Sequence, residues 1–362
     1  MNILFIVIDT LRADHLSCYG YFRKTSPTLD RLAEEGVLFE GSFASAIATG
    51  PGFTSLFTGL AAINHRYYIT PWNVPNTRQL DDDIPTLPEV LQENGYTTAA
   101  LDNLVNFRSH PKHFVRGFEF YINVTKTPKW VHHHVTADQI NHRLIPWIKD
   151  HFDEKFFLFV HYWDPHTPYN QPEPFRKLFS HRKNLSDLMI QKAPAGYEYV
   201  PGWGKKDEVF EGDEHRSIDL YDGEIAYVDR AVGQVIEVLE QEKVLEDTLM
   251  IVTSDHGEGL GQHGTYGHAG LHEEVIFVPL ILKYPAGLPR GERVRGFVQH
   301  VDLLPTILDL AEVSNVPKTD GESLLSLIHG REPRGEIFIE TGRADGTLEA
   351  GGQRAIRTGD WK

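Results

Sequence analysis

The stretch NILFIVIDT, residues 2–10, decides the fold class. It is an unbroken apolar run rich in β-branched residues, and it ends in the polar pair Asp9 and Thr10. Such a run indicates a strand that is buried on both faces, as strands of parallel sheets are. The stretch TLMIVTSDH, residues 248–256, repeats the pattern and ends in Asp255 and His256.

Helical patterns alternate with these strands along the chain. SPTLDRLAEEG (26–36) reads as a helix with Ser26 as its cap, and the segments 137–152 and 219–243 read as longer helices. Further strands are predicted at 37–44, 155–163 and 275–285, the last from VIFVPLILKYP. The alternation predicts an α/β fold with a mainly parallel central sheet flanked by helices, formed by one catalytic domain over 1–362.

Two segments do not follow this periodicity, near 105–130 and 170–211. Both are long and rich in aromatic, basic and proline residues. We interpret them as insertion loops, which in an α/β fold either roof a site or decorate the surface.

Composition narrows the classes of partner. The chain has 362 residues, 41% of them hydrophobic, and a formal net charge of −16. That charge argues against a nucleic-acid-binding surface or an anionic membrane as partner, because no excess of Lys and Arg exists to displace counterions. No apolar stretch reaches the length of a membrane segment, and no signal peptide precedes residue 2, so we expect a cytoplasmic protein. The oligomeric state is not indicated.

Polar residues gather where predicted strands end. Asp9, Asp255 and His256 follow strands directly, and Thr49 stands before a helix that starts at TGPGFTSLFTG. Ligands of α/β sheets sit at the carboxyl ends of strands, and two carboxylates with an imidazole can hold a divalent cation there. Such a cation would lower the pKa of a hydroxyl beside it. Thr49 is therefore either the cap of its helix or a nucleophile, and the local sequence leaves both open.

The whole chain resembles the sulfatase family of the alkaline phosphatase superfamily. The resemblance rests on motifs in the family's order, among them NILFIVIDTLRADHLSCYG, TGPGFTSLFTGL, FFLFVHYWDPHTPY, SDHGEGLGQHGTYGH and AIRTGDWK. It implies the alkaline phosphatase fold and activity as an ester hydrolase on a small anionic substrate. Members usually continue into a small C-terminal subdomain, which we expect to be absent or truncated here.

The resemblance also implies roles for matched positions. Metal ligation is implied for Asp9, Thr49, Asp255 and His256. Catalytic roles are implied for Thr49, His166 and His268, with His166 at the leaving-group oxygen and His268 on the substrate anion. Substrate contacts are implied for His65, Asn103 and Thr10. The cofactor would be one or two divalent ions, and Mn²⁺, Zn²⁺, Ca²⁺ and Mg²⁺ are not distinguished.

Departures from the family pattern predict the chemistry. Sulfatases carry a cysteine or serine, matured to formylglycine, in Cys/Ser-x-Pro-x-Arg, where this chain has Thr49 and, in place of the arginine, Phe53. Threonine is the nucleophile of phosphate-ester relatives, in which it forms a phosphothreonine. We therefore expect a hydrolase of phosphodiesters, phosphonates or phosphomonoesters. The alternatives are a sulfatase, a phosphoryl-alcohol transferase and a catalytically inactive binding protein.

Other histidines and one aspartate have plainer interpretations. His161 and Asp164 are expected to support the proline loop that carries His166, with Asp164 able to orient a histidine. His263, in GQHG, is interpreted as a turn residue. The run 132–134 is interpreted as surface or lid, because adjacent residues point in different directions.

Overall fold

The computed structural model describes residues 1–47, 49–68, 79–102, 112–124, 135–179, 214–264, 266–268, 270–341 and 352–359. Asn103, the histidine run 132–134 and most of the predicted insertions lie outside these residues. No helix among the described residues is long and apolar enough to cross a membrane.

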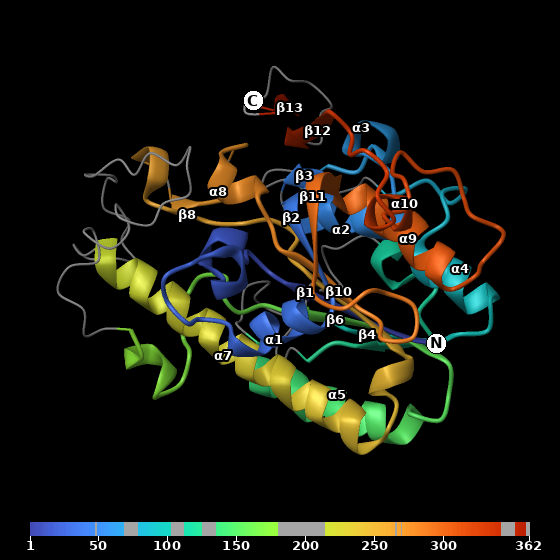
Figure 1. Cartoon of the computed structure of the whole chain (residues 1–362), viewed down its shortest axis with the longest axis horizontal. Helices are drawn as coiled ribbons and strands as arrows, with labels where there is room; N and C mark the ends of the chain where they lie inside the picture. Colours follow the sequence, from blue (N-terminus) through green and yellow to red (C-terminus); the bar gives the residue numbers. More distant parts are fainter. Residues whose placement is uncertain are drawn as a thin grey trace.

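The described strands and helices follow one another as shown in Figure 1. The strands are β1 (Asn2–Ile8), β2 (Val37–Phe43), β3 (Ala46–Ile47), β4 (Thr97–Leu101), β5 (Phe120–Ile122), β6 (Phe156–Tyr162), β7 (Thr248–Thr253), β8 (Gly259–Leu260), β9 (Tyr266–Gly267), β10 (Leu280–Lys283), β11 (Glu292–Gln299), β12 (Glu336–Thr341) and β13 (Gln353–Thr358). The helices are α1 (Pro27–Glu35), α2 (Thr49–Thr58), α3 (Ala62–His65), α4 (Leu87–Glu93), α5 (Ala137–His151), α7 (Glu214–Gln241), α8 (Glu273–Ile276), α9 (Leu303–Leu310) and α10 (Leu325–Ile328).

The central sheet has eight strands in the order β11-β2-β10-β7-β1-β6-β4-β5. β1 pairs in parallel with both β6 and β7, and β4 pairs in parallel with β5 and β6. Only β10 runs antiparallel to its neighbours in this sheet as described. The predicted α/β class with a mainly parallel sheet is confirmed.

Helices cover both faces of this sheet, and the side chains of β1 alternate between the two cores. Leu4, Ile6 and Ile8 pack in the core beneath α1, α5 and α7. Phe5 and Val7 pack in the opposite core beneath α2, α4 and α9. Because successive side chains of a strand point to opposite faces, a strand between two helical layers must be apolar throughout. This is why NILFIVI carries no polar residue after Asn2.

The predicted strand over 275–285 is wrong in its first half. Val275 and Ile276 belong to the short helix α8, and β10 begins only at Leu280. The amides of both residues bind the carbonyl of His272, which closes a helical turn. Pro279 has no N–H to donate to a sheet and so separates the two elements. An apolar run shows burial, and here it spans a helix and a strand.

The segment near 105–130 is not wholly an insertion loop, and that prediction is corrected. Phe120–Ile122 form β5, which pairs in parallel with β4 and makes the edge of the central sheet. The strand is short and Phe120 is exposed, so no alternating pattern marks it in the sequence. In the second segment, the described residues 170–179 include a short turn of 3₁₀ helix at Phe175–Lys177.

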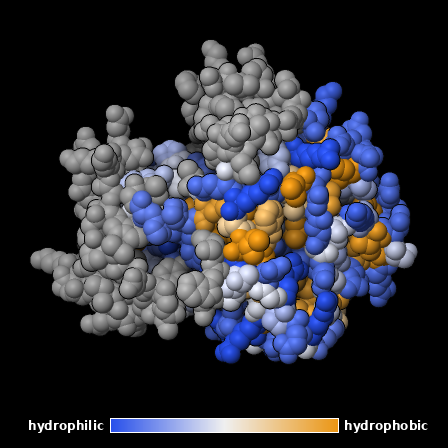
Figure 2. Space-filling view, turned by 90° about the horizontal axis from the view of Figure 1, so that it is seen from above, coloured by the Kyte–Doolittle hydropathy of each residue, from blue (hydrophilic) through white to orange (hydrophobic). Residues whose placement is uncertain are grey.

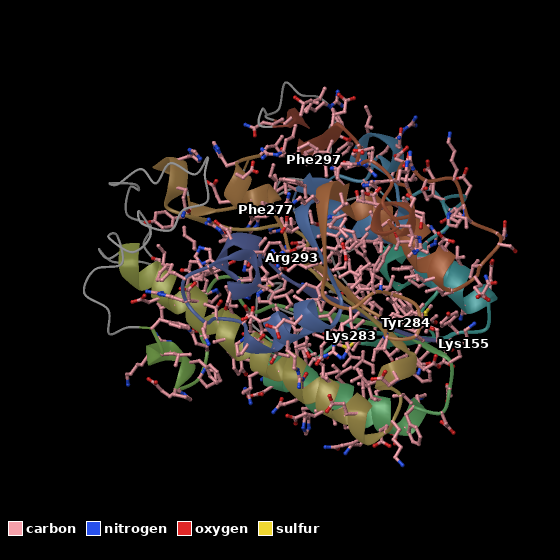
Figure 3. All side chains as sticks on the ribbon, viewed as in Figure 1. Lys155, Phe277, Lys283, Tyr284, Arg293 and Phe297 are labelled. Carbon is pink, nitrogen blue, oxygen red and sulfur yellow. The ribbon has the colours of Figure 1, made fainter. Side chains whose placement is uncertain are left out.

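The last described strands form a second, smaller sheet, and the prediction that the C-terminal subdomain is absent or truncated stays a prediction. β12 pairs antiparallel with β13 and parallel with β3, giving a three-stranded sheet that lies at the top of Figure 1. Phe43 at the end of β2 contacts Phe277 and Phe297 at ring-centroid distances of 5.5 and 5.8 Å (Figure 3). Figure 2 views the molecule from above the orientation of Figure 1. On this upper face, polar and apolar side chains of the described residues are interspersed.

The helix α1 is held against β10 and α7 by polar contacts. Lys283 of β10 forms an ion pair of 2.8 Å with Glu35 (Figure 3). Gly36 ends the helix, and a Cβ there would lie 2.3 Å from the carbonyl oxygen of Leu282. Only glycine therefore permits this approach of α1 to the sheet.

The cap of α1 differs from the prediction. Ser26 is at the N-cap position, but its side chain makes no capping bond. The carboxylate of Asp229 from α7 instead accepts the amides of Thr28 and Leu29 at 3.0 and 2.9 Å. The cap comes from a distant helix, and no local motif in the sequence announces it.

Replacing Asp229 by alanine is expected to lower the free energy of unfolding by about 1–2 kcal/mol, the usual cost of losing a cap. The loss follows from two amides of α1 left without an acceptor. Urea unfolding followed by circular dichroism measures it. Asp229→Asn keeps an acceptor oxygen and should lose less, and equal stability of Asp229→Ala and wild type would contradict the assignment.

Candidate active site

The ends of β1 and β7 bring two carboxylates together. Val7 pairs with Thr253 in the parallel register, so Asp9 and Asp255 follow their strands side by side. Asp9, Asp255 and His256 are fully buried, and one ligand atom from each lies within 4.8 Å of the others. The amide of Thr10 donates to Asp255 Oδ1 at 3.2 Å, which orients that carboxylate.

These donors fit a divalent cation. Asp9 Oδ1 and Asp255 Oδ2 are buried and accept no hydrogen bond from the described residues. Burial raises the pKa of Asp255, although the charge of His161 and hydrogen bonds from Thr49 and the backbone oppose the rise. Buried carboxylate oxygens without donors are costly unless a cation compensates them. The observed set of two carboxylates and one imidazole suits such an ion.

His256 is held in the tautomer that a metal ligand requires. Its Nδ1 donates to the carbonyl of Gly257 at 2.9 Å, which leaves the lone pair of Nε2 directed toward the carboxylates. Burial, together with the nearby His268, lowers the pKa of His256 to about 4 against the opposing charge of Asp9. The imidazole is therefore neutral.

Thr49 faces this cluster from the start of α2. Its Oγ1 lies 3.2 Å from His256 Nε2, and its side chain is 9% exposed. Because α2 begins at Thr49, the positive end of the helix dipole lies at the same place and favours an anionic group there. The hydroxyl faces Asp255 and His256, and its role as a nucleophile stays a prediction.

A buried chain of hydrogen bonds supports Asp9 from behind. His161 in β6 contacts Asp102 through Nδ1 at 2.8 Å and Asp9 Oδ2 through Nε2 at 3.2 Å. Burial lowers the pKa of His161, but the hydrogen bonds and charges of the two carboxylates outweigh it and raise the pKa to about 10. Tyr121 of β5 donates to the other oxygen of Asp102. His161 thus fixes Asp9, whereas the sequence suggested support for the proline loop.

Asp102 was missed by the sequence reasoning. It directly follows β4, which is the same strand-end signal that identified Asp9 and Asp255. The neighbouring position, Asn103, lies outside the described residues, and its predicted substrate contact stays a prediction.

His166 and His268 lie on the open side of the cluster. The ring of His268 is 4.4 Å from that of His256 and 5.3 Å from that of His166. His166 Nδ1 donates to the carbonyl of Thr167 at 2.6 Å, so Nε2 is the nitrogen left for other contacts. Both residues lie beside the cluster, and their catalytic roles stay predictions.

Glu258 is a further buried group that the sequence reasoning did not identify. It is 1% exposed, and its Oε2 lies 3.6 Å from His268 Nδ1. Burial lowers the pKa of His268, but Glu258, with help from Asp9 and Asp255, raises it to about 9. His268 is therefore a cation at neutral pH, as suits contact with an anionic substrate.

His65 and Thr10 take different positions. His65 is buried, with Nε2 3.2 Å from Ser55 Oγ and Nδ1 accepting the amide of Tyr67, so its described contacts are with α2 and the loop after α3. Burial, with His113, lowers its pKa to about 3.

Thr10 has a φ of 56°, which is uncommon for a β-branched residue and marks local strain beside the cluster. The predicted substrate contacts of both residues stay predictions.

Asp164 anchors the loop of His166 to α7. Asp164 and Glu224 are buried and share one site, and burial raises the pKa of Asp164 to about 7 and that of Glu224, beside the Asp164 charge, to about 9. Glu224 also accepts the amide of Gln171 at 2.9 Å. The raised pKa values favour protonated forms of this buried pair.

Comparison with known proteins gives the family. The family model described as Sulfatase matches residues 1–313, so the chain belongs to the sulfatase family, within the alkaline phosphatase superfamily. It is accordingly an ester hydrolase.

The similar proteins include some named as sulfatases and one named as a phosphonate monoester hydrolase. The chain is 28% identical to the multifunctional alkaline phosphatase superfamily protein PehA of Trinickia caryophylli, over 94% of this chain and 80% of the relative. It is 24% identical to a sulfatase of Formosa agariphila, over 99% and 79%. Among solved structures, a phosphonate monoester hydrolase of Agrobacterium radiobacter matches with a TM-score of 0.76 at 23% identity, over 99% and 85%. The putative sulfatase yidJ of Bacteroides fragilis matches with a TM-score of 0.78 at 23% identity, over 99% and 84%.

The Asp164–Glu224 pair predicts a pH dependence of stability. Both pKa values are raised in the folded state, so the folded protein binds more protons than the unfolded one, and stability falls as pH rises from about 4 to about 9. Glu224→Gln should therefore show a smaller decrease in Tm between pH 6 and pH 9 than wild type. The control is Glu237→Gln at an exposed position of α7, which should follow wild type. An unchanged slope in Glu224→Gln would contradict the assignment.

The carboxylate cluster predicts metal-dependent stability. Ca²⁺ should raise Tm, since an ion that binds only the folded state stabilises it by about 2.7 kcal/mol at a hundredfold excess over Kd. Asp9→Asn should abolish this rise, and Asp153→Asn, at an exposed site after α5, should keep it. A rise that survives in Asp9→Asn would contradict the cluster as a metal centre.

Proposed function

We propose that the chain hydrolyses phosphorus esters, with Thr49 as the nucleophile. The observation that carries the proposal is the Thr49 hydroxyl, which faces Asp255 and His256 at 3.2 Å from His256 Nε2 at the start of α2. A threonine stands where sulfatases carry a residue that is matured to an aldehyde, and it keeps a free hydroxyl. That hydroxyl can attack phosphorus directly.

Three residues would hold the cation, and they are Asp9, Asp255 and His256. When bound, such an ion lowers the pKa of a neighbouring hydroxyl and balances charge on the substrate oxygens. His161 keeps Asp9 in position, and the neutral His256 offers Nε2. We propose one or two divalent ions, and the donor set does not distinguish Mn²⁺, Zn²⁺, Ca²⁺ and Mg²⁺.

In the proposed reaction Thr49 Oγ1 releases its proton to solvent and forms a bond to phosphorus as the bond from phosphorus to the leaving oxygen breaks. His166 Nε2 gives a proton to the leaving alcohol, and the cationic His268 binds the non-bridging oxygens. Water then attacks the phosphothreonine, which returns Thr49 to its free form and releases phosphate or a phosphate ester. An alcohol that replaces water makes the same site a transferase.

A sulfuric ester is the second candidate substrate. It is supported by the sulfatases among the relatives, including the one from Formosa agariphila. The same donors bind a sulfate oxygen as readily as a phosphate oxygen, so the site geometry does not separate the two classes. The nucleophile does, because Thr49 lacks the aldehyde of matured sulfatases.

Replacing Thr49 by alanine is expected to lower kcat on phosphorus esters by roughly 10⁴-fold or more, as loss of a nucleophile does. Turnover is measured with metal-loaded protein on bis-p-nitrophenyl phosphate, p-nitrophenyl phosphate, a p-nitrophenyl phosphonate and p-nitrophenyl sulfate. Thr49→Ser keeps a hydroxyl and should retain most of the activity.

Full activity in Thr49→Ala would exclude Thr49 as the nucleophile. Sulfate turnover that exceeds turnover of every phosphorus ester would assign the protein to the second candidate. No turnover on any ester, with metal bound, would point to a binding protein.

A further inference from the structure

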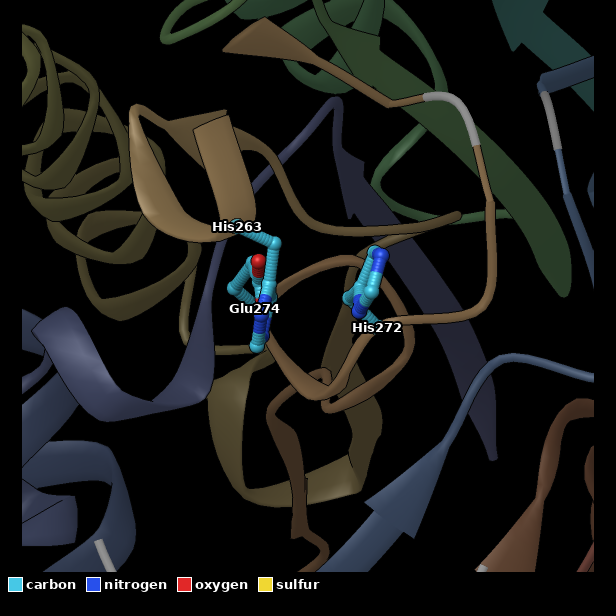
Figure 4. Close-up of side chains that lie close together, drawn as sticks. All are labelled: His263, His272 and Glu274. Carbon is cyan, nitrogen blue, oxygen red and sulfur yellow. The ribbon is translucent and has the colours of Figure 1, made fainter. Parts of the chain in front are cut away.

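A second group of metal-ligating side chains lies outside the candidate active site. His263 is in the turn Gln262–Gly264, His272 precedes α8, and Glu274 is within α8. One ligand atom from each lies within 4.8 Å of the others. Figure 4 shows the three side chains gathered from these two elements.

Glu274 is buried without enough partners. Its side chain is 5% exposed, and Oε1 has no hydrogen-bond partner among the described residues. Its Oε2 is 3.6 Å from His263 Nε2, beyond hydrogen-bond distance. A buried carboxylate with an unpartnered oxygen is costly, and native proteins compensate such groups with a donor or a cation.

The two imidazoles are positioned by the backbone around them. His263 has a φ of 55°, in the left-handed region that few non-glycine residues adopt. The preceding Gln262 is fixed by the guanidinium of Arg12, which donates to its Oε1 at 3.2 Å. The rings of His263 and His272 stack at a centroid distance of 4.0 Å and an angle of 18°. The predicted turn at His263 is present, and it aims the ring at α8.

We propose that His263, His272 and Glu274 form a second metal site, which takes Zn²⁺. Two imidazoles and one carboxylate are a known donor set for zinc, with water in the fourth position. Mg²⁺ and Ca²⁺ prefer oxygen ligands and fit this set less well. Zinc ligands at about 2.1 Å lie about 3.4 Å from one another in a tetrahedron, so the ligand atoms, which lie within 4.8 Å of one another, must close by at most about 1.4 Å. The two solvent-accessible imidazoles can do so by rotation.

A metal ion at this site would restrain the segment that carries His268. His263 and His272 flank His268 in the sequence, and an ion that joins them removes conformational freedom from the segment between. α8 also touches the loop of His256, because the Gly257 amide donates to the carbonyl of Val275 at 2.7 Å. A Cβ on Gly257 would lie 2.1 Å from the carbonyl oxygen of Glu274, so this contact requires glycine. The benefit to His268 rests on the proposed function, whereas the metal site does not.

Zinc binding in a variant without the first cluster tests the proposal. Asp9→Asn with Asp255→Asn removes the carboxylates of the candidate active site, and Zn²⁺ is titrated into the metal-free protein by calorimetry. We expect one remaining equivalent, which is lost when His263→Ala and His272→Ala are added. The matched control is His329→Ala, an exposed histidine after α10, which should keep it. If the background variant does not fold, His263→Ala and His272→Ala are introduced into the wild-type chain instead. That variant should bind one equivalent of Zn²⁺ fewer than the control His329→Ala.

Unchanged zinc stoichiometry on loss of His263 and His272 would overturn the proposal, and so would a background variant that folds but binds no zinc.

Glu274→Gln gives an independent readout. It should abolish the zinc-induced rise in Tm that remains in the background variant, without lowering Tm of the metal-free protein, because the amide removes a buried charge. A zinc-induced rise that survives in Glu274→Gln would contradict the carboxylate as a ligand. Since the readout is zinc binding, its failure leaves the proposal for Thr49 standing, and the converse also holds.

Discussion

The parallel pairing of β1 with β7 forces two carboxylates together in the protein interior. The rest of the site compensates for their charge and holds them in place. Asp9 and Asp255 follow paired strands and are fully buried. Like charges about 4 Å apart repel by about 4 kcal/mol even at an effective dielectric constant of 20. Cationic His161 balances part of this charge from below, and a divalent ion is the natural complement on the open side.

The residues around the cluster divide by the side they face. Asp102 and His161 lie beneath Asp9, within the sheet, and hold it in place. Thr49, His166 and His268, for which we propose catalytic roles, lie on loops and a helix start at the carboxyl ends of the strands. This division follows from topology, because strand interiors are inaccessible and strand ends open onto the sheet edge. It explains how a rigid support and a reactive face come from one set of strands.

Much of this arrangement was predictable from the sequence, because apolar runs with polar ends are strong local signals. That rule gave the parallel sheet and the placement of Asp9, Asp255 and His256. It failed where the decisive contact is distant in sequence. Asp229 caps α1 from another helix, and His161 acts from within an apolar strand, so neither has a local signature. The run 275–285 was misread because burial alone does not separate the turn of α8 from β10.

The most direct test of the account is mass spectrometry of protein quenched with acid during turnover of a phosphorus ester. The account predicts that the peptide containing Thr49 gains the mass of one phosphoryl group, that fragmentation places it on Thr49, and that it disappears once the substrate is consumed. A transient phosphoryl group on another residue, or a single turnover during which Thr49 stays unmodified at every quench time, would contradict the central role given to this threonine.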